Sequence, residues 1–455
     1  MRRAGCAIAV LLSGCLARPP QPAEVLQQAL PEGTTVPPAW STATSSDAVT
    51  NDWLASFDDP GLDAVVAEAI ANNPDLRQAA AKVEIAQQIV VVVGSRLKPQ
   101  IGVRLGAAST RDLGEDDTFN SNLEYAGLVW EIDVWGRLRS QQAAAEQSAE
   151  ATALDYDFAR LSLAATTARS WYQVTEAGRL LAVAEQSVQI DTALLDLVRV
   201  RRDAGKVAEF DVVQASAALA SAQSELRGAQ EVYTEARRAL ELRLGRYPAA
   251  EIEAHDDFVP VPPPVKAGIP SSLLERRPDV MAAERQVVAA FRREEAAKLA
   301  LLPSIALTLD GGRLSDNLLS LLGLNPTLLH GVIGMEVPIY EGGRLRARIQ
   351  IATAEQAGAV AGYGAAALQA FGEVETALTN EALFAERLQY DQAALADRTD
   401  AVRLAKIRYT AGASDLLTVL ILQTAQLRSE ADVIQLRNAQ LANRINLHLA
   451  LGGSF

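Results

Sequence analysis

The sequence contains few of the side chains that enzymes and metal sites require. Its 455 residues include only 2 cysteines, 3 histidines and 3 methionines, and aromatic residues make up 5% of the chain. The chain also has no Gly-rich phosphate loop, no nucleophile elbow and no cluster with metal-ligand spacing. We therefore expect a protein that is not an enzyme and that holds no metal and no non-covalent cofactor.

Positive charge is scarce as well. The chain has 42 Lys and Arg residues against 56 Asp and Glu residues, which gives a formal net charge of −14. Nucleic acid is therefore not an expected partner, because the chain has no basic surplus with which to neutralise phosphates. No run of 18 or more apolar residues follows the N-terminus, which excludes a membrane-spanning helix. The alanine-rich composition favours long, closely packed helices.

The N-terminus has the features of a secretory signal. Arg2 and Arg3 precede a short apolar run, and small residues follow it. The sequence LSGC, which ends at Cys15, resembles a bacterial lipobox. This resemblance implies cleavage before Cys15 and a covalent lipid on it, and Leu16 favours sorting to the outer membrane. An ordinary signal that is cleaved slightly later is the alternative.

The two halves of the mature chain repeat the same landmarks in the same order. Pro74 and Pro278 are 204 residues apart, as are Pro99 and Pro303. Four further pairs are 207 residues apart, namely Gly136 and Gly343, Arg201 and Arg408, Gly205 and Gly412, and Leu244 and Leu451. Arg201 and Gly205 belong to one motif, so these pairs mark five landmarks, and their common order indicates two tandem repeats of about 200 residues.

The repeat sets the domain boundaries. We expect a signal peptide at 1–14, a lipid-anchored extended tether at 15–50, repeat 1 at 51–245, an inter-repeat segment at 246–275 and repeat 2 at 276–455.

Each repeat reads as three helices and a strand segment. A helix of about 20 residues (Asp75 to Arg96; Asp279 to Leu301) begins next to a proline, which is favourable at a helix start. A very long helix follows at 137–204 or 344–411, and a further helix runs from Asp211 to Leu244 or from Leu416 to Leu449. A helix of about 68 residues is roughly 100 Å long. We therefore expect a mainly α fold with long antiparallel coiled coils.

Two segments, at about 100–135 and 304–341, alternate apolar and polar residues with the period of a β-strand. We expect four strands, and the polar face carries Arg104, Glu131, Asp133 and Glu336. The pattern fits an outer-membrane barrel, with these four side chains in its lumen, and it fits a half-buried soluble sheet equally well. Known membrane barrels have at least eight strands, so a barrel here requires several chains.

Several motifs resemble one family. LERRPDVMAAERQV (274–287), LLPSIALT (301–308), WEIDVWGRLR (130–139) and the terminal LALGG are similar to TolC-like outer-membrane efflux proteins, above all to the NodT-like lipoprotein branch. The resemblance covers essentially the whole mature chain. It implies a homotrimer with a shared twelve-stranded β-barrel in the outer membrane of a Gram-negative cell and an α-helical tunnel in the periplasm. The tether, the inter-repeat segment and the C-terminus would form its equatorial region.

The resemblance also implies a role. The trimer would be the passive exit duct for small molecules such as drugs in a tripartite efflux pump. Its partners would be a periplasmic adaptor protein and an inner-membrane transporter of the resistance-nodulation-division type. A polypeptide secretion duct of the same fold remains an alternative. A periplasmic coiled-coil scaffold lipoprotein is a second alternative, but it would not need two strand hairpins at matching places in two repeats.

The turns that end the long helices are candidate docking sites. Gly205 and Gly412 stand where a left-handed helix cap is needed. Arg201 and Arg408 lie one turn earlier, where a cation complements the helix dipole and can bond the last carbonyls. The resemblance implies that these turns also contact the adaptor.

The family closes its tunnel with residues just after these turns. Matching the motif places Leu417 at an apolar constriction, and Ile421 at a position that is commonly acidic in relatives. The counterpart of Ile421 in repeat 1 is Gln214. Asp415 and Asp211 lie nearby and could supply charge, although Asp at a helix start is usually a cap. We therefore expect a gate that is narrowed by Leu417 and Ile421 and is less cation-selective than an acidic ring.

Overall fold

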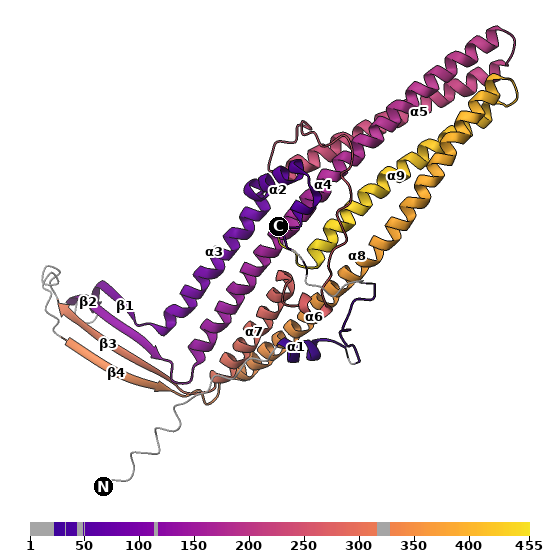
Figure 1. Ribbon diagram of the computed structural model, residues 1–455. Helices are drawn as coiled ribbons and strands as arrows, with labels where there is room; N and C mark the ends of the chain where they lie inside the picture. Colours follow the sequence, from indigo (N-terminus) through magenta and orange to yellow (C-terminus); the bar gives the residue numbers. More distant parts are fainter. Residues whose placement is uncertain (1–21, 32, 43–48, 50, 113–116, 316–327) are drawn as a thin grey trace. The chain divides into compact units, whose positions relative to one another are not determined.

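A computed structural model describes residues 22–31, 33–42, 49, 51–112, 117–315 and 328–455. As the sequence predicted, the chain is mainly helical with four antiparallel strands (Figure 1). Cys15, the expected lipidation site, lies outside the described residues. Within the described residues, no helix is both long enough and apolar enough to span a membrane.

The two repeats form matching helices. Each begins with a helix that starts at a proline, α3 (Pro74–Gly94) or α7 (Pro278–Leu299). Each continues in a helix of 67 residues, α4 (Arg137–Asp203) or α8 (Arg344–Thr410). Each ends in a helix of 35 residues, α5 (Glu209–Arg243) or α9 (Leu416–Ala450). The long helices end within one residue of the expected positions, because a glycine stops each of them.

Short helices complete the fold. They are α1 (Pro22–Ala29), η1 (Leu54–Phe57), α2 (Pro60–Asn72), η2 (Ser95–Leu97) and α6 (Pro270–Leu273). Helix α1 corrects the expectation of an extended tether over 15–50. Pro22 is favourable at a helix start and Glu24 in the first turn complements the helix dipole. Val25 is buried, so packing stabilises this helix within a Pro-rich segment.

The chain divides into two compact units, and each of them draws on both repeats. Unit 1 comprises Met1–Thr34, Ala81–Asp155 and Asp279–Ala366, and unit 2 comprises Thr35–Ala80, Tyr156–Pro278 and Ala367–Phe455. Because both units combine segments that are distant in sequence, neither corresponds to a single repeat.

Unit 1 contains the sheet. Its strands are β1 (Gln100–Asp112), β2 (Asp117–Ile132), β3 (Ser304–Ser315) and β4 (Leu328–Glu336). They pair antiparallel in the order β1-β2-β3-β4. Strands β1 and β4 therefore each have one neighbour among the described strands, and each leaves one edge for another partner.

The helices of unit 1 also follow one order. Gly94 of α3 lies against Gln142 of α4. Helix α4 binds α7, since Arg285 forms an ion pair with Glu150 at 3.4 Å. Helix α7 binds α8 through Thr353 Oγ1, which donates to Glu294 at 2.8 Å. The order is therefore α3-α4-α7-α8, with α3 and α8 on the outside.

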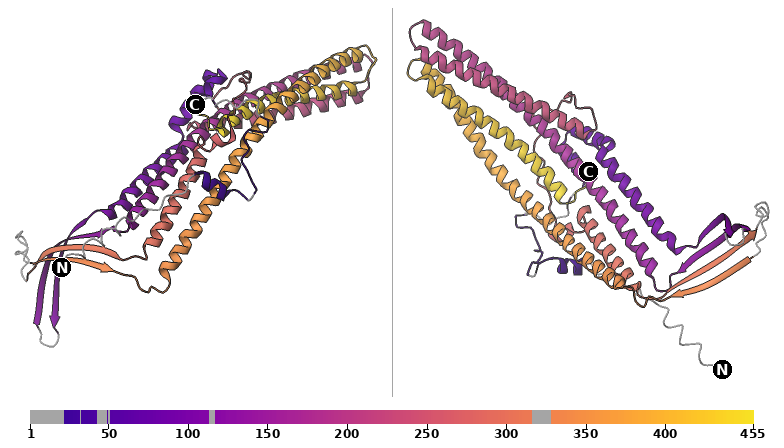
Figure 2. Two further views of the ribbon diagram at one scale, coloured as in Figure 1. Left: turned by 60° about the horizontal axis from the view of Figure 1, so that its bottom comes forward. Right: turned by 180° about the vertical axis from the view of Figure 1, so that it is seen from behind.

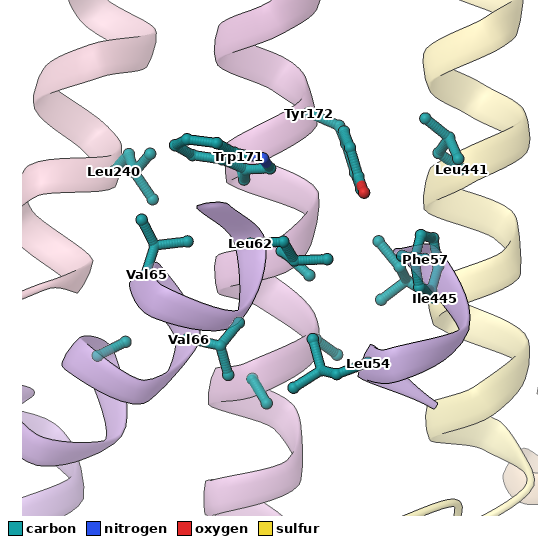
Figure 3. Close-up of a cluster of buried hydrophobic side chains, with 14 of the residues drawn as sticks. Leu54, Phe57, Leu62, Val65, Val66, Trp171, Tyr172, Leu240, Leu441 and Ile445 are labelled. Carbon is teal, nitrogen blue, oxygen red and sulfur yellow. The ribbon is translucent and has the colours of Figure 1, made fainter. Parts of the chain in front are cut away.

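Unit 2 contains a large apolar core where η1 and α2 pack on three helices (Figure 3). That view labels Leu62 and Val66 of α2, Phe57 of η1, Tyr172 of α4 and Ile445 of α9, which belong to this one cluster. All five side chains are buried. This core fixes η1 and α2 against the middle of α4.

Beyond this core, α4, α5, α8 and α9 run together to the two turns that end the long helices (Figure 2). Buried polar pairs join them. Gln423 of α9 donates to Asp191 of α4 at 2.7 Å, and burial raises the pKa of this carboxyl. Asn443 of α9 donates to the Ala377 carbonyl of α8 at 2.9 Å. Such pairs fix which faces of the helices meet.

Candidate functional site

The turns at the ends of α4 and α8 have the same geometry. Gly205 and Gly412 adopt φ values of +69° and +77°, so the predicted left-handed caps are confirmed. Lys206 N donates to the Arg201 carbonyl at 2.9 Å, and Ala413 N donates to the Arg408 carbonyl at 2.8 Å. Together with the bonds of the glycine N–H groups, these complete a Schellman motif at each end.

Arg201 acts on the other long helix rather than on its own. Its Nη1 donates to the carbonyls of Tyr409 at 2.9 Å and of Thr410 at 3.1 Å, which are the last carbonyls of α8. Its guanidinium carbon lies 4.6 Å from the centre of the Tyr409 ring. The expected pairing of an arginine with free carbonyls is therefore present, but it joins the two turns.

An apolar core lies behind these turns. It contains Tyr409 and residues from all four helices, namely Leu194, Leu195, Val198, Val212, Ala215, Ala405, Leu416 and Val419. Burial raises the pKa of Tyr409, Arg201 opposes this shift and the charge of Asp211 adds to it. The structure thus brings Arg201, Asp211 and Tyr409 into one electrostatic group. Tyr409 was not predicted from the sequence, although it follows Arg408 directly.

The two apolar gate candidates are accessible in the single chain. Leu417 is 49% exposed and Ile421, one turn later, is 59% exposed. Both lie on α9, at its first and second turns, whereas their neighbours Leu416 and Val419 are buried. Two large apolar side chains on an exposed helix face are available for a constriction, but their role stays a prediction.

The two acidic gate candidates differ from each other. Asp415 is the N-cap of α9, since its carboxylate accepts from Thr418 N at 2.8 Å. Hydrogen bonding from the side chain and the backbone of Thr418 lowers the pKa of Asp415. Asp211 is not a cap, because α5 begins at Glu209 after the N-cap residue Ala208. Gln214, one turn further along α5, is half-buried. Of the two acidic gate candidates, Asp211 is therefore the one whose carboxylate is not used as a helix cap.

Sequence reasoning also missed Phe210. It is 67% exposed, and it lies 207 residues before Leu417, so it is the counterpart of Leu417 in repeat 1. The repeat offset, which had already related Ile421 to Gln214, would have found it.

The strand register tests the expected polar face. Arg104 pairs with Tyr125, Glu131 with Ala306, and Glu336 with Ser304, which places Arg104, Glu131 and Glu336 on one face of the sheet. The opposite face carries large apolar residues such as Ile101, Leu128, Leu307 and Ile333. Asp310 and His330, which pair with each other on the polar face, were not predicted.

Asp133 was assigned wrongly to this face. Strand β2 ends at Ile132, and the Asp133 carboxylate accepts from the backbone N–H groups of Leu138 and Arg139, both at 3.0 Å. It therefore caps the start of α4. Glu131 is also engaged, since Arg137 donates to both of its oxygens at 2.6 and 2.8 Å.

Both repeats match one known family. The outer membrane efflux protein family matches this chain over residues 65–246 and 269–453, which together cover both repeats. The chain belongs to this family. The resemblance that the motifs indicated is thereby confirmed.

Relatives match over nearly the whole chain. OpmQ of Pseudomonas putida, a pyoverdine export outer membrane protein, is 31% identical over 444 residues, which cover 93% of this chain and 93% of OpmQ. CusC of Escherichia coli, a cation efflux system protein, is 29% identical and covers 89% of this chain, with 88% of CusC matched.

Solved structures match equally well. A crystal structure of CusC has a TM-score of 0.81 and 27% identity, covering 92% of this chain and 97% of that chain. The open state of the MtrE outer membrane channel of Neisseria gonorrhoeae has a TM-score of 0.81 at 25% identity, covering 92% of this chain and 95% of that one. This member of the outer membrane efflux family is therefore an outer-membrane efflux channel, which is a non-enzymatic class.

Proposed function

We propose that three copies of this chain form one passive exit duct for small molecules such as drugs in a tripartite efflux pump. The observation that carries the proposal is the family match over both repeats, because it includes every element of the tunnel and the sheet. The three four-stranded sheets would join β4 of one copy to β1 of the next and close a twelve-stranded barrel. Closure would leave no sheet edge without a partner.

The outer helices of unit 1 support the trimer. Ile85 and Val92 lie on the same face of α3, about two turns apart, and are 59% and 68% exposed. On α8, Gly358, Ala361 and Ala365 form an exposed stripe of small residues. Large apolar side chains on one outer helix therefore fit a shallow surface on the other, as in close helix packing.

The repeat offset explains why these surfaces match. Within the chain, Ala151 of α4 and Ala289 of α7 are buried in unit 1, where the two helices meet. Their counterparts are Gly358 of α8 and Ile85 of α3, at offsets of 207 and 204 residues. A small residue on one helix thus opposes a larger one on the other, which keeps the packed volume similar. The α8–α3 contact between copies would repeat the α4–α7 contact inside one copy.

The proposed partners are a periplasmic adaptor protein and an inner-membrane transporter of the resistance-nodulation-division type. The turns with Arg201, Gly205, Arg408 and Gly412 are the proposed adaptor contacts. Their support is the family pattern together with the exposure of Gly205 and Gly412. A rigid Schellman turn offers a fixed shape to a partner.

The cargo is proposed only as a class. OpmQ is named for pyoverdine export and CusC for cation efflux, so relatives at similar identity serve different compounds. A passive duct does not need to bind its cargo, and the inner-membrane partner would select it. Acylation of Cys15 is likewise a proposal, supported by the lipobox alone.

The gate provides a direct test. Ile421→Asp should raise the preference for cations in planar-bilayer recordings, because three carboxylates would replace three apolar side chains at the constriction. Val232→Asp is a matched control, since Val232 is similarly exposed on α5 but lies away from the turns. Equal cation preference in both variants would count against Ile421 as a lining residue. If the parent protein showed no conductance in these recordings, that result would count against the proposed duct itself.

A further inference from the structure

The starts of the two long helices differ in how one arginine is bound. Arg139 of α4 and Arg346 of α8 are 207 residues apart, so they are counterparts in the two repeats. Asp133 holds the Arg139 guanidinium, since its carboxylate accepts from Nε at 3.3 Å and its carbonyl accepts from Nη2 at 3.2 Å. The counterpart of Asp133 in repeat 2 is Tyr340, so the carboxylate is replaced there by a phenol.

Tyr340 and Arg346 both reach solvent in the single chain. Tyr340 is 87% exposed. Arg346 is exposed too, and its guanidinium has no hydrogen-bond or ion-pair partner among the residues that the structure describes. A guanidinium binds a phosphate or carboxylate through two parallel hydrogen bonds. Arg346 is therefore available to an anion that repeat 2 itself does not supply.

Arg346 lies on the side of α8 that is turned away from the polar face of the sheet. Arg348 lines a polar pocket of about 210 Å³ together with Glu131 and Glu336, which are on that polar face. Side chains two residues apart on an α-helix point about 160° away from each other. Arg346 therefore shares the side of the apolar face of the sheet, which meets lipid in the proposed barrel.

Helix α1 lies on the same side of α8. Gly364 follows Arg346 by 18 residues, which is about five full turns, so the two positions share one face. A Cβ atom at Gly364 would lie 2.5 Å from the Ala29 carbonyl oxygen, so α1 packs closely on this face. The chain that precedes α1 begins at Cys15, the proposed lipid site. This face of α8 is therefore the one that a lipid anchor would share.

The sheet ends beside an aromatic residue of the kind found at membrane surfaces. Trp130 lies two residues before the end of β2 and pairs with Leu307 on the apolar face. Its indole Nε1 donates to the Leu97 carbonyl at 2.9 Å. Tryptophan and tyrosine are enriched where an apolar ring can sit at the membrane–water interface. Trp130 and Tyr340 thus mark the periplasmic boundary of the membrane in the proposed barrel.

A neighbouring copy offers no carboxylate to Arg346 at this level. In the proposed trimer α8 contacts α3 of the next copy, and the chain from Ile85 to Arg111 contains no Asp or Glu. It carries Arg96 and Lys98 directly before β1, and both are exposed. Three basic side chains would therefore meet at each junction between copies. The partner that fits this charge is an anion from outside the protein.

We propose that Arg346 and Tyr340 of each copy bind the headgroup of an anionic phospholipid in the periplasmic leaflet of the outer membrane, beside Arg96 and Lys98 of the next copy. The guanidinium binds the phosphate, and the Tyr340 ring lies at the boundary with the acyl chains. A phospholipid fits because the site joins a free cation and an exposed aromatic ring to an apolar sheet face. This inference rests on the proposed barrel and adds a lipid contact at its periplasmic rim.

Lipid retention tests the site in the full-length protein. The detergent-purified protein is mixed with equal amounts of phosphatidylglycerol, which is anionic, and phosphatidylcholine, which is zwitterionic, and native mass spectrometry counts the lipids bound to the intact particle. Arg346→Gln removes the cation of the site. Arg348→Gln is the matched control, because it removes the same charge on the opposite side of α8. Tyr340→Asp keeps Arg346 and restores the carboxylate that holds Arg139 in repeat 1.

The parent trimer should retain phosphatidylglycerol in preference to phosphatidylcholine. Arg346→Gln and Tyr340→Asp should each weaken phosphatidylglycerol binding about fivefold, the effect of one basic residue at an anionic membrane surface. Arg348→Gln should bind as the parent does. A trimer without preference for phosphatidylglycerol, or with equal binding in Arg346→Gln and Arg348→Gln, would overturn the inference and leave the proposed function intact. A particle that is not a trimer would refute the proposed assembly and this inference together.

Discussion

At the scale of single residues, the Asp59 carboxylate caps a helix and also binds two side chains from other segments. Its carboxylate accepts from Leu62 N at 3.0 Å and from the Trp171 indole at 3.0 Å, and it contacts His255 Nε2 at 2.9 Å. Burial alone would raise the pKa of Asp59, but these hydrogen bonds outweigh it and hold the pKa below its usual value of 3.8. Asp59 thus ties the inter-repeat segment and α2 to α4.

Replacement of this carboxylate should destabilise the protein. Asp59→Ala leaves the Trp171 and Leu62 donors buried without an acceptor, which costs about 2–4 kcal/mol. Because its folded pKa is lowered, the contribution is present above about pH 4 and is lost as the pH falls below that value. Thermal unfolding measured by circular dichroism tests this, with Asp63→Ala on the exposed side of α2 as control. Equal thermal unfolding midpoints for Asp59→Ala and Asp63→Ala would contradict this role of Asp59.

His448 is the second residue with a measurable pH signature. It is buried, stacks on Trp53 with ring centres 5.8 Å apart, and neither ring nitrogen has a hydrogen-bond partner among the described residues. Burial and the nearby Arg444 charge lower its pKa from 6.5 to about 4. The unfolded chain therefore binds this proton more tightly than the folded chain does.

The stability of the protein should accordingly fall between pH 6.5 and pH 4. The contribution of His448 is complete above pH 6.5 and decreases by up to about 3 kcal/mol per chain as the pH approaches 4. His448→Phe keeps the stacking on Trp53 and removes the titration. Unfolding midpoints of the parent and the variant should converge at high pH and diverge in this range. Parallel profiles would show that His448 is not the titrating group.

At the scale of elements, two glycines with the same backbone conformation differ in their surroundings. Gly412 and Gly452 have φ values of +77° and +67°. A Cβ atom at Gly412 would meet nothing within 4 Å, whereas at Gly452 it would lie 2.9 Å from the Arg276 carbonyl oxygen. The first position requires glycine for its backbone conformation only, and the second also for a close approach.

Alanine substitutions should separate these two requirements. Gly412→Ala should destabilise the protein by about 1 kcal/mol, through the left-handed conformation alone. Gly452→Ala should cost at least about 2 kcal/mol more, because backbone must move away. Chemical denaturation of the two variants side by side is the measurement. A similar loss of stability in both variants would contradict this prediction, because it would mean that the backbone at Arg276 moves away from the new Cβ atom at little cost.

Helix positions could be predicted from the sequence because their signals are local. Pro74 and Pro278 mark helix starts and Gly205 and Gly412 mark helix ends, and the repeat gave each signal twice. Asp133 shows where local signals fail. The alternation of strand β2 continues through it, and only the cap of α4 reveals that the strand has ended.

Contacts between distant segments could not be predicted. Arg201 was expected near free carbonyls, but its partner Tyr409 lies 208 residues away, and only the packing of α4 against α8 selects it. The Asp59 cluster depends in the same way on segments separated by 112 and 196 residues. The tip group of Arg201, Asp211 and Tyr409 therefore required the structure, whereas its exposed neighbour Phe210 follows from the repeat.

At the scale of the whole molecule, the proposed duct depends on the assembly of several copies of the chain. Among the described residues, β1 and β4 each have one neighbouring strand, and the outer helices α3 and α8 expose apolar or small side chains. In the proposed assembly each of these surfaces meets the one at the other side of the same unit in the next copy. Cyclic joining of identical copies satisfies all of these surfaces, whereas head-to-tail joining without closure would give fibres. We propose that three copies close this ring.

The mass of the intact particle tests this claim most directly. The full-length protein, purified in detergent and measured by native mass spectrometry, should give a single species of three chains. A stable monomer, a dimer or a ladder of sizes would contradict the shared duct, because four strands in one chain would then lack the partners that close them.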